Sequence, residues 1–234
     1  MRDRAHRFVV ALTLVVAVYV AIAYWLVPLG WREYAEDHPA FDNNPRLTVT
    51  ADGHPGDPLN VALVGSQADL ERIMAAAGWV RARRLDILND LDIAVDSVLG
   101  RSDVTAPVSN LFLFGRKEDL AFEQPVGDSP RRRNHVRFWR QSVPDTAARP
   151  VWIGAASYDE AVGISHTTGE ITHHIAPDVD AERDHLAADL KATGELSKSY
   201  SVPGFHTVLE GRNGGGDPWV TDGALWVGVI GQGG

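Results

Sequence analysis

The sequence predicts an α/β (α+β) fold, in which one globular domain with a mixed β-sheet and about three helices follows one N-terminal transmembrane helix. Three observations lead to this prediction. An uncharged apolar run opens the chain, helical periodicity appears early and late in the remainder, and a period close to two dominates the middle. Helices on either side of a block of strands are typical of a sheet that helices cover.

The composition is that of an ordinary globular protein. Of the 234 residues, 44% are hydrophobic and 23% charged, which fits one domain and an anchor. The formal net charge is −9, and residues 1–7 are net positive, so the rest of the chain is acidic. An acidic domain argues against nucleic-acid binding, which needs clustered Lys and Arg. The lack of cysteine excludes disulfides, thiolate nucleophiles and Cys-ligated metal sites.

The apolar run at residues 8–29 contains no charged residue and is long enough, as a helix, to cross a hydrocarbon core of about 30 Å. Aromatic residues near its end suit a membrane interface. Arginines before the run and acidic residues after it predict a cytoplasmic N-terminus and an extracytoplasmic domain. A signal peptide cleaved after Ala21-Ile22-Ala23 is the alternative, and both interpretations export the domain.

The next segment, residues 30–58, is rich in Pro, Asp, Asn and Gly and lacks periodicity, which is typical of a linker. The predicted division is therefore a cytoplasmic N-terminus (1–7), a transmembrane anchor (8–29), a linker (30–58) and a globular domain (59–234). We expect the domain to fold without the segments before it.

The globular domain opens with a buried strand at 60–64. Ser66 and Asp69 then resemble a capping box that begins a helix ending near Ala77, before Gly78. A second helix is predicted at 86–99, where apolar residues fall close to one face, with Gly100 as its C-cap.

Strands are predicted in the middle of the domain, at 110–114, 135–140, 151–157 and 162–166. A turn at 167–169 should return the chain as a partner strand at 170–175. Pro177 then begins a helix that Gly194 ends, and two last strands, 199–202 and 224–230, are joined across a glycine-rich loop.

Several stretches, as a set, resemble the LssY C-terminal-like domain family over roughly residues 59–230. They are 58–66 (PLNVALVGS), 106–109 (APVS), 111–116 (LFLFGR), 133–137 (RNHVR), 165–169 (SHTTG), 173–184 and 210–218 (EGRNGGGDP). The family has no established activity. Members are often fused behind multi-span modules, including phosphatidic-acid-phosphatase-type modules, so the resemblance implies work at the membrane or on its lipids. This chain has one predicted span and lacks the Lys/Arg-Pro, Pro-Ser-Gly-His and Ser-Arg…His motifs of such a phosphatase.

The densest polar region holds histidines and carboxylates on both sides of the predicted turn. The turn would bring histidines from two strands together, and carboxylates crowd the start of the next helix. Such a group could hold a divalent ion such as zinc or manganese, or form an acid–base pair. The catalytic candidates are His166, His173, His174, Asp178 and Asp180.

A structural interpretation competes with the catalytic one. Acidic residues favour a helix N-terminus because they complement its dipole. Adjacent histidines on a strand point to opposite faces, so His173 and His174 cannot both ligate one ion without local distortion. No HExxH or EF-hand spacing is present, so the cofactor stays unknown.

Two further segments are candidates for ligand binding. Arginine side chains suit phosphate and carboxylate groups, so the arginine run could hold an anionic headgroup, although such runs are usually solvated loops. The glycine-rich segment would let backbone amides approach a ligand, although a wide hairpin loop explains it equally well. The candidates are Arg131, Arg132 and Arg133 in the run and Arg212, Asn213 and Asp217 in the loop.

The sequence thus predicts a membrane-anchored envelope protein that is a binding or accessory module for an anionic ligand, lipid or partner. The alternative is a hydrolase, possibly metal-dependent, that uses the three candidate histidines and the carboxylates at 178–182. The spatial arrangement of the candidate residues distinguishes the two hypotheses. An enzyme would place His166, one of the two adjacent histidines, Asp178 and Asp217 around one pocket. Scatter over separate faces would favour the module.

Overall fold

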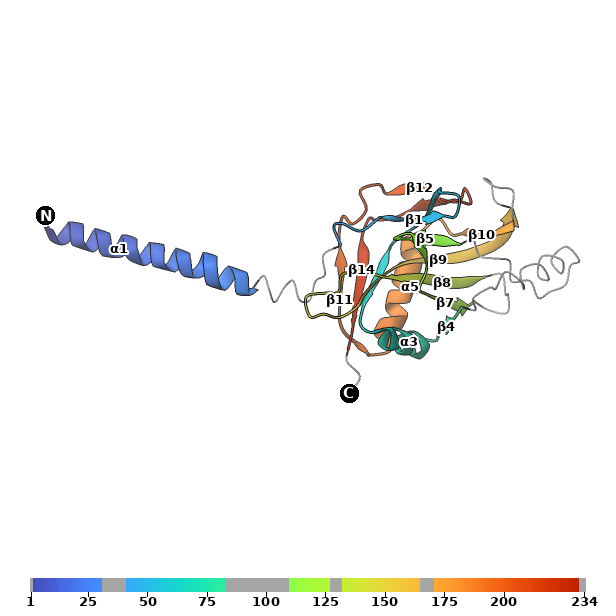
Figure 1. Ribbon diagram of the computed structural model, residues 1–234, viewed down its shortest axis with the longest axis horizontal. Helices are drawn as coiled ribbons and strands as arrows, with labels where there is room; N and C mark the ends of the chain where they lie inside the picture. The colour runs from blue at the N-terminus through green and yellow to red at the C-terminus, as the bar shows by residue number, and fades with distance from the viewer. Residues whose placement is uncertain (1, 31–40, 83–109, 127–131, 165–170, 232–234) are drawn as a thin grey trace, which may run out of the picture. The chain divides into compact units, whose positions relative to one another are not determined.

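The computed structural model describes residues 2–30, 41–82, 110–126, 132–164 and 171–231 (Figure 1). It divides into two compact units, Met1–Ala40 with Pro144–Ala148, and Phe41–Val143 with Arg149–Gly234. The predicted helix at 86–99, the turn at 167–169, and the side chains of His166 and Arg131 lie outside the described residues.

The first unit contains helix α1 (Arg2–Ala21) followed by a π-helical turn, η1 (Ile22–Leu26). Residues His6–Gly30 form a helical stretch of 25 residues with a mean hydropathy of 2.5. Apolar side chains such as Leu14 and Val15 are exposed along it. By length and composition, this is the one helix among the described residues that could cross a membrane.

The second unit is built on an eight-stranded sheet. Its strands are β3 (Val61–Val64), β4 (Val80–Arg81), β7 (Leu120–Pro125), β8 (Arg133–Arg140), β9 (Val151–Ile164), β10 (Ile171–Ile175), β11 (Leu196–Val202) and β14 (Leu225–Ile230). The order is β11-β14-β3-β9-β8-β7-β4, with β10 paired to β9. Only β14 and β3 are parallel among these pairs, so the predicted mixed sheet is confirmed.

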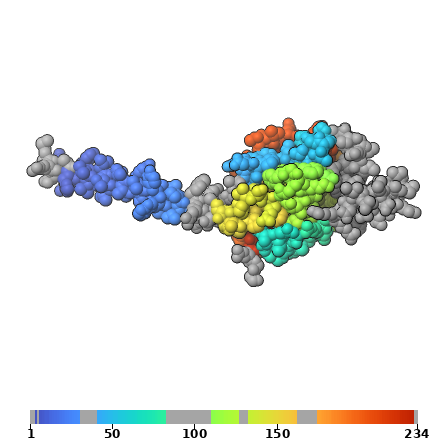
Figure 2. Space-filling model, in the orientation of Figure 1, coloured from blue at the N-terminus to red at the C-terminus, as the bar shows by residue number. Residues whose placement is uncertain are grey.

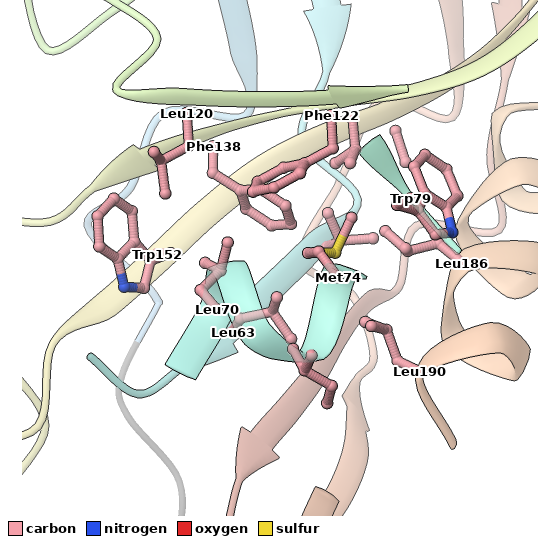
Figure 3. Close-up of a cluster of buried hydrophobic side chains, with 14 of the residues drawn as sticks. Leu63, Leu70, Met74, Trp79, Leu120, Phe122, Phe138, Trp152, Leu186 and Leu190 are labelled. Carbon is pink, nitrogen blue, oxygen red and sulfur yellow. The ribbon is translucent and has the colours of Figure 1, made fainter. Parts of the chain in front are cut away.

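Helices α3 (Gln67–Ala76) and α5 (Val179–Ala192) cover one face of this sheet (Figure 1). The predicted capping box is present, because Ser66 Oγ accepts from Asp69 N–H and the Asp69 carboxylate accepts from Ser66 N–H. Apolar side chains of both helices pack against the sheet in one cluster, in which Met74 lies near Phe138 and Leu186 lies near Trp79 (Figure 3). This cluster is the larger hydrophobic core.

A small four-stranded sheet covers the opposite face of the large sheet. Its strands, in the order β2-β1-β5-β6, are β1 (Leu47–Thr50), β2 (Pro55–Pro58), β5 (Leu111–Leu113) and β6 (Arg116–Lys117). Strand alternation separates the two cores, since Val61 and Leu63 face the helices while Ala62 and Val64 pack with Leu111. The blue and green segments that hold these strands lie side by side on the surface (Figure 2).

Residues 30–58 were predicted to be a linker, but the small sheet includes part of this segment. The second half of this segment forms β1 and β2, and Phe41 is 3% exposed within the second core. The sequence of β2, Pro-Gly-Asp-Pro, has no apolar alternation, which is why the pattern did not predict a strand there.

The other predicted strands and the late helix are present within a few residues of their predicted bounds, and two of the predicted strands are merged. Residues 151–157 and 162–166 were predicted as two strands, but Val151–Ile164 is the single long strand β9. Between β11 and β14 the chain forms a separate hairpin, β12 (Glu210–Arg212) with β13 (Pro218–Val220). The glycine-rich loop is the turn of this hairpin.

Candidate functional site

A group of polar side chains lies on the helix-free face of the large sheet, at one end of β8 and β9. We call it the polar cluster. Along β8 the residues at alternate positions are Arg133, His135 and Arg137, followed by the apolar Trp139. All four are buried, and only Trp139 belongs to the second hydrophobic core. The sequence of β8 therefore divides this face into a polar end and an apolar end.

Strand β9 supplies the partners, because His135 lies opposite Ser157 and Arg133 lies opposite Asp159. Directly opposite side chains on an antiparallel pair are within contact distance. His135 Nε2 lies 2.8 Å from Ser157 Oγ, and His135 Nδ1 lies 3.0 Å from Asp159 Oδ1. The second contact has the distance of an ion pair without the alignment of a hydrogen bond. Ser157 is 1% exposed and Asp159 is 0% exposed.

The arginines on either side of His135 are bound differently. Arg133 Nε donates to Asp159 at 3.1 Å and its Nη1 donates to Glu123 at 3.0 Å. Arg137 Nη1 lies 3.4 Å from His135 Nε2 and 3.5 Å from Asp57 Oδ2. Arg133 thus has close carboxylate partners, whereas both contacts of Arg137 are long.

The polar cluster continues from Arg137 into the small sheet and the hairpin. Asp57 on β2 accepts from Asn213 Nδ2 at 3.2 Å, and Asn213 Oδ1 accepts from the backbone N–H of Asp217 at 2.9 Å. Asp217 Oδ1 lies 2.6 Å from His174 Nδ1, and its Oδ2 accepts from the Ile175 N–H at 3.3 Å. Segments that are far apart in the sequence therefore meet in one connected network.

A buried carboxyl lies behind this network, on the helical side of the sheet. Glu182 of α5 is 4% exposed, and its Oε1 has no hydrogen-bond partner among the described residues. Burial, together with the nearby carboxylates of Asp189 and Asp159, raises the pKa of Glu182 to about 9. The side chain is therefore protonated at neutral pH.

The catalytic candidates from the sequence are bound in different ways. His174 is held by Asp217, whereas Asp178 caps α5 by accepting from the N–H groups of Asp180 and Ala181. The Asp180 carboxylate accepts from Thr221 and is paired with Arg183. The Asp180 pKa is raised, chiefly by burial.

His166 and the side chain of His173 lie outside what the structure describes. Among the candidates that can be placed, His174 contacts Asp217, while Asp178 and Asp180 have separate partners. The described residues contain no group of three or more His, Asp or Glu side chains that could hold a metal ion.

The ligand-binding candidates divide in a similar way. Arg132 is exposed and Arg133 is buried in the polar cluster, so the described part of the arginine run is not one solvated surface. In the hairpin, Asn213 and Asp217 belong to the cluster, while Arg212 donates to the Gly216 carbonyl within the turn.

Sequence reasoning did not select Asp57, His135, Arg137, Ser157 or Asp159 for the site. A usable signal was present in the two facing strands. His135 and Arg137 alternate on a predicted strand, and Ser157-Tyr158-Asp159 follows the apolar run at 151–156 with the same period. The register that places Ser157 opposite His135 is a tertiary property and could not be read from either strand alone.

Comparison with known proteins gives one finding. A family model described as LssY C-terminus matches residues 41–225. No curated protein matches the chain, and no solved structure does. The matched range begins at the first residue of the second unit and includes every member of the polar cluster. Because the match covers most of the sequence, this chain belongs to the LssY C-terminus family.

Proposed function

We propose that this protein is a membrane-anchored envelope protein whose globular domain binds an anionic ligand at the polar cluster. Free phosphate, a phosphorylated molecule and an anionic lipid headgroup share the chemistry that such a site would recognise. The single observation that supports an anion site is that the buried Arg137 guanidinium makes only long polar contacts with the described residues.

Arg137 is a buried cation with unused hydrogen-bonding capacity. A guanidinium has five N–H donors and stays charged at any physiological pH. Within the described residues, its polar contacts are the two long ones made by Nη1, to Asp57 and His135. The Nε and Nη2 atoms donate to none of these residues. An anion placed there would satisfy them.

The other buried arginines show what a satisfied guanidinium looks like in this protein. Arg133 is paired with two carboxylates, and Arg183 donates to the Asp222 carboxylate through both Nη atoms, at 2.8 and 3.1 Å. Asp57 cannot do the same for Arg137, because its Oδ1 accepts from Asn213 and its Oδ2 lies 3.5 Å away. A ligand anion is the partner that would complete the site.

The membrane part of the proposal is supported by the apolar helix His6–Gly30 and by the charges around it. Arg2, Arg4 and Arg7 lie at its N-terminal end, and Glu33, Glu36 and Asp37 follow it in the sequence. By the positive-inside rule this distribution orients the N-terminus to the cytoplasm and the domain to the other side.

The binding proposal is tested with inorganic phosphate and the full chain in nanodiscs of neutral lipid. Phosphate should raise the melting temperature of the wild type, because a ligand that binds only the folded state stabilises it. The Arg137→Gln variant should lose this shift. Arg116→Gln is the matched control, since Arg116 is a half-exposed arginine paired with Asp119, and it should respond like the wild type. Equal phosphate responses in all three proteins would overturn the proposal.

The source of the anion is separated by a second measurement. A rise in the melting temperature of the full chain when its nanodiscs contain phosphatidylglycerol, lost in Arg137→Gln and made smaller by free phosphate, identifies a lipid headgroup. A phosphate response that anionic lipid does not alter identifies a soluble ligand.

Membrane orientation is tested independently of the ligand. A periplasmic-type reporter fused after Gly234 should be active only outside the cytoplasm, and the protein should stay with membranes after carbonate washing. A released chain that begins near Tyr24 would instead show that residues 1–23 are a cleaved signal peptide.

A further inference from the structure

We infer that Ser157, His135 and Asp159 act as nucleophile, general base and positioning carboxylate in the hydrolysis of an ester that carries an anionic group. The inference rests on the proposed function for the anion subsite at Arg137. It goes beyond that function by assigning a reaction, and it uses residues other than the catalytic candidates found in the sequence.

The neighbours of His135 favour one tautomer of its imidazole ring. An arginine side chain can only donate hydrogen bonds, so the 3.4 Å contact of Arg137 Nη1 with His135 Nε2 favours the tautomer in which Nε2 is an acceptor. In that tautomer Ser157 Oγ, 2.8 Å from the same nitrogen, donates its O–H to Nε2. This is the geometry in which an imidazole removes a proton from a serine hydroxyl.

Asp159 completes the arrangement from the other side of the ring. If Nε2 is the acceptor of the neutral imidazole, the proton lies on Nδ1, which is 3.0 Å from Asp159 Oδ1. A carboxylate there favours this tautomer and stabilises the imidazolium that forms when His135 takes the serine proton. The contact is not aligned as a hydrogen bond, and such contacts often tighten only when substrate is bound.

The bonding of Ser157 differs from that of the structural polar groups in the same core. The buried side chains of Thr48 and Asn60 bind backbone carbonyls, Asp57 O for the first and Ala156 O and Val179 O for the second. Those bonds join backbone segments of neighbouring elements. The Ser157 hydroxyl instead binds the imidazole of His135. That contact adds nothing to the backbone ladder and is the one a nucleophile needs.

The reaction is an acyl transfer in two steps. Ser157 Oγ attacks the ester carbonyl carbon and gives its proton to His135 Nε2. The C–O bond to the alcohol then breaks as the alcohol oxygen takes that proton. Water attacks the acyl-serine, loses a proton to His135, and releases the acid as Oγ is reprotonated. The Arg137 cation beside Nε2 is placed to hold the anionic group of the substrate next to the reacting centre.

The first test is covalent labelling of the full chain in detergent with a fluorophosphonate, which forms a P–O bond to an activated serine and releases fluoride. Labelling should be stoichiometric and should map to Ser157. It should be lost in Ser157→Ala and retained in Ser201→Ala, a control at an exposed serine of β11. A wild-type protein that stays unlabelled overturns the inference.

A second test uses the absence of cysteine from the chain. The Ser157→Cys variant carries a single thiol, and so does the control Ser201→Cys. If His135 acts as a base, the thiol at position 157 should react with iodoacetamide at a lower pH than the thiol at position 201, whose pKa should be near the ordinary value of about 8.5. Adding His135→Gln or Asp159→Asn should move the profile of the first variant upward by about one pH unit or more. A profile that neither change moves contradicts the assigned roles, whatever those changes do to stability.

Failure of this inference and failure of the proposed function give different results. If phosphate binding depends on Arg137 but fluorophosphonate does not label the protein, the cluster binds anions without catalysis. If Ser157 is labelled and Arg137→Gln changes neither the labelling nor the phosphate response, Ser157 is a nucleophile and Arg137 is not part of an anion site. When labelling occurs, fatty acid released from phosphatidylglycerol vesicles identifies a lipid ester, and hydrolysis confined to a soluble anionic aryl ester identifies a soluble one.

Discussion

Arg133 and Asp159 face each other directly across β8 and β9, and the Arg133 Nε donates to the Asp159 carboxylate at 3.1 Å. Asp159 is completely buried and Arg133 is 8% exposed. Taking two charges out of water is costly, and removing one member of such a pair leaves the other buried without its partner charge. The pair therefore helps to hold the polar ends of the two strands in register. Removing either side chain should lower the free energy of unfolding.

The first prediction concerns this pair. Arg133→Met should lower the free energy of unfolding by about 3–5 kcal/mol, because the Asp159 carboxylate loses its guanidinium partner. The double variant Arg133→Met/Asp159→Leu should be more stable than the sum of the two single effects predicts. Urea unfolding of the four proteins in detergent measures the coupling. Additive effects would show that the two side chains do not interact in the folded protein.

The second prediction concerns the buried Glu182. Its pKa is about 9 in the folded protein and 4.5 in an ordinary setting, so between these pH values the folded state holds more protons than the unfolded state. Stability should therefore fall as the pH rises through this window. Glu182→Gln removes the titrating group, so the variant should match the wild type near pH 5 and exceed it by a few kcal/mol, on the order of 1.4 per pH unit, at higher pH.

The control for Glu182 is Glu210→Gln, at an exposed residue of β12, which should leave the pH dependence unchanged. Melting temperatures from pH 5 to 9 provide the comparison. Parallel curves for wild type and Glu182→Gln would mean that Glu182 has an ordinary pKa and a partner for its charge.

Local signals explain why much of the fold could be predicted from the sequence. The capping box at Ser66 begins α3 where expected, and the apolar stripe that includes Leu186 and Leu190 marks the buried face of α5. These features depend on residues a few positions apart. Most strands of the large sheet were also predicted from their own apolar patterns, whereas β4 and β7 were not.

The site needed information that no single segment contains. Asp57 lies in a short strand without apolar alternation, and it meets Arg137 and Asn213 only after two sheets and a hairpin have packed together. The importance of Ser157 depends on the register of β8 and β9, which places it opposite His135. The contact between His174 and Asp217 and the capping role of Asp178 likewise depend on how β10, the hairpin and α5 pack.

The third prediction concerns where the globular domain begins. Residues 41–58 contain Phe41 and the strands β1 and β2, which cover apolar side chains such as Val64 and Leu111 of the second core. A chain of residues 41–234 should be soluble and unfold cooperatively. A chain of residues 59–234 should aggregate, because it exposes that face and removes Asp57 from Arg137. Size-exclusion chromatography and calorimetry compare the two. Cooperative unfolding of the shorter chain would show that residues 41–58 are a linker that the domain does not need for folding.

The last prediction separates the two roles considered for Asp178. Its Oδ1 accepts from the N–H groups of Asp180 and Ala181, both at 3.1 Å, so it satisfies donors that the first turn of α5 would otherwise leave unpaired. If capping is its whole role, Asp178→Ala should cost about 1 kcal/mol of unfolding free energy, and Asp178→Ser should restore most of the loss, because serine is an equally good cap. Neither variant should change phosphate binding or the labelling of Ser157. A serine variant of normal stability that loses either property would show instead that the Asp178 carboxylate takes part in the site, as the sequence first suggested.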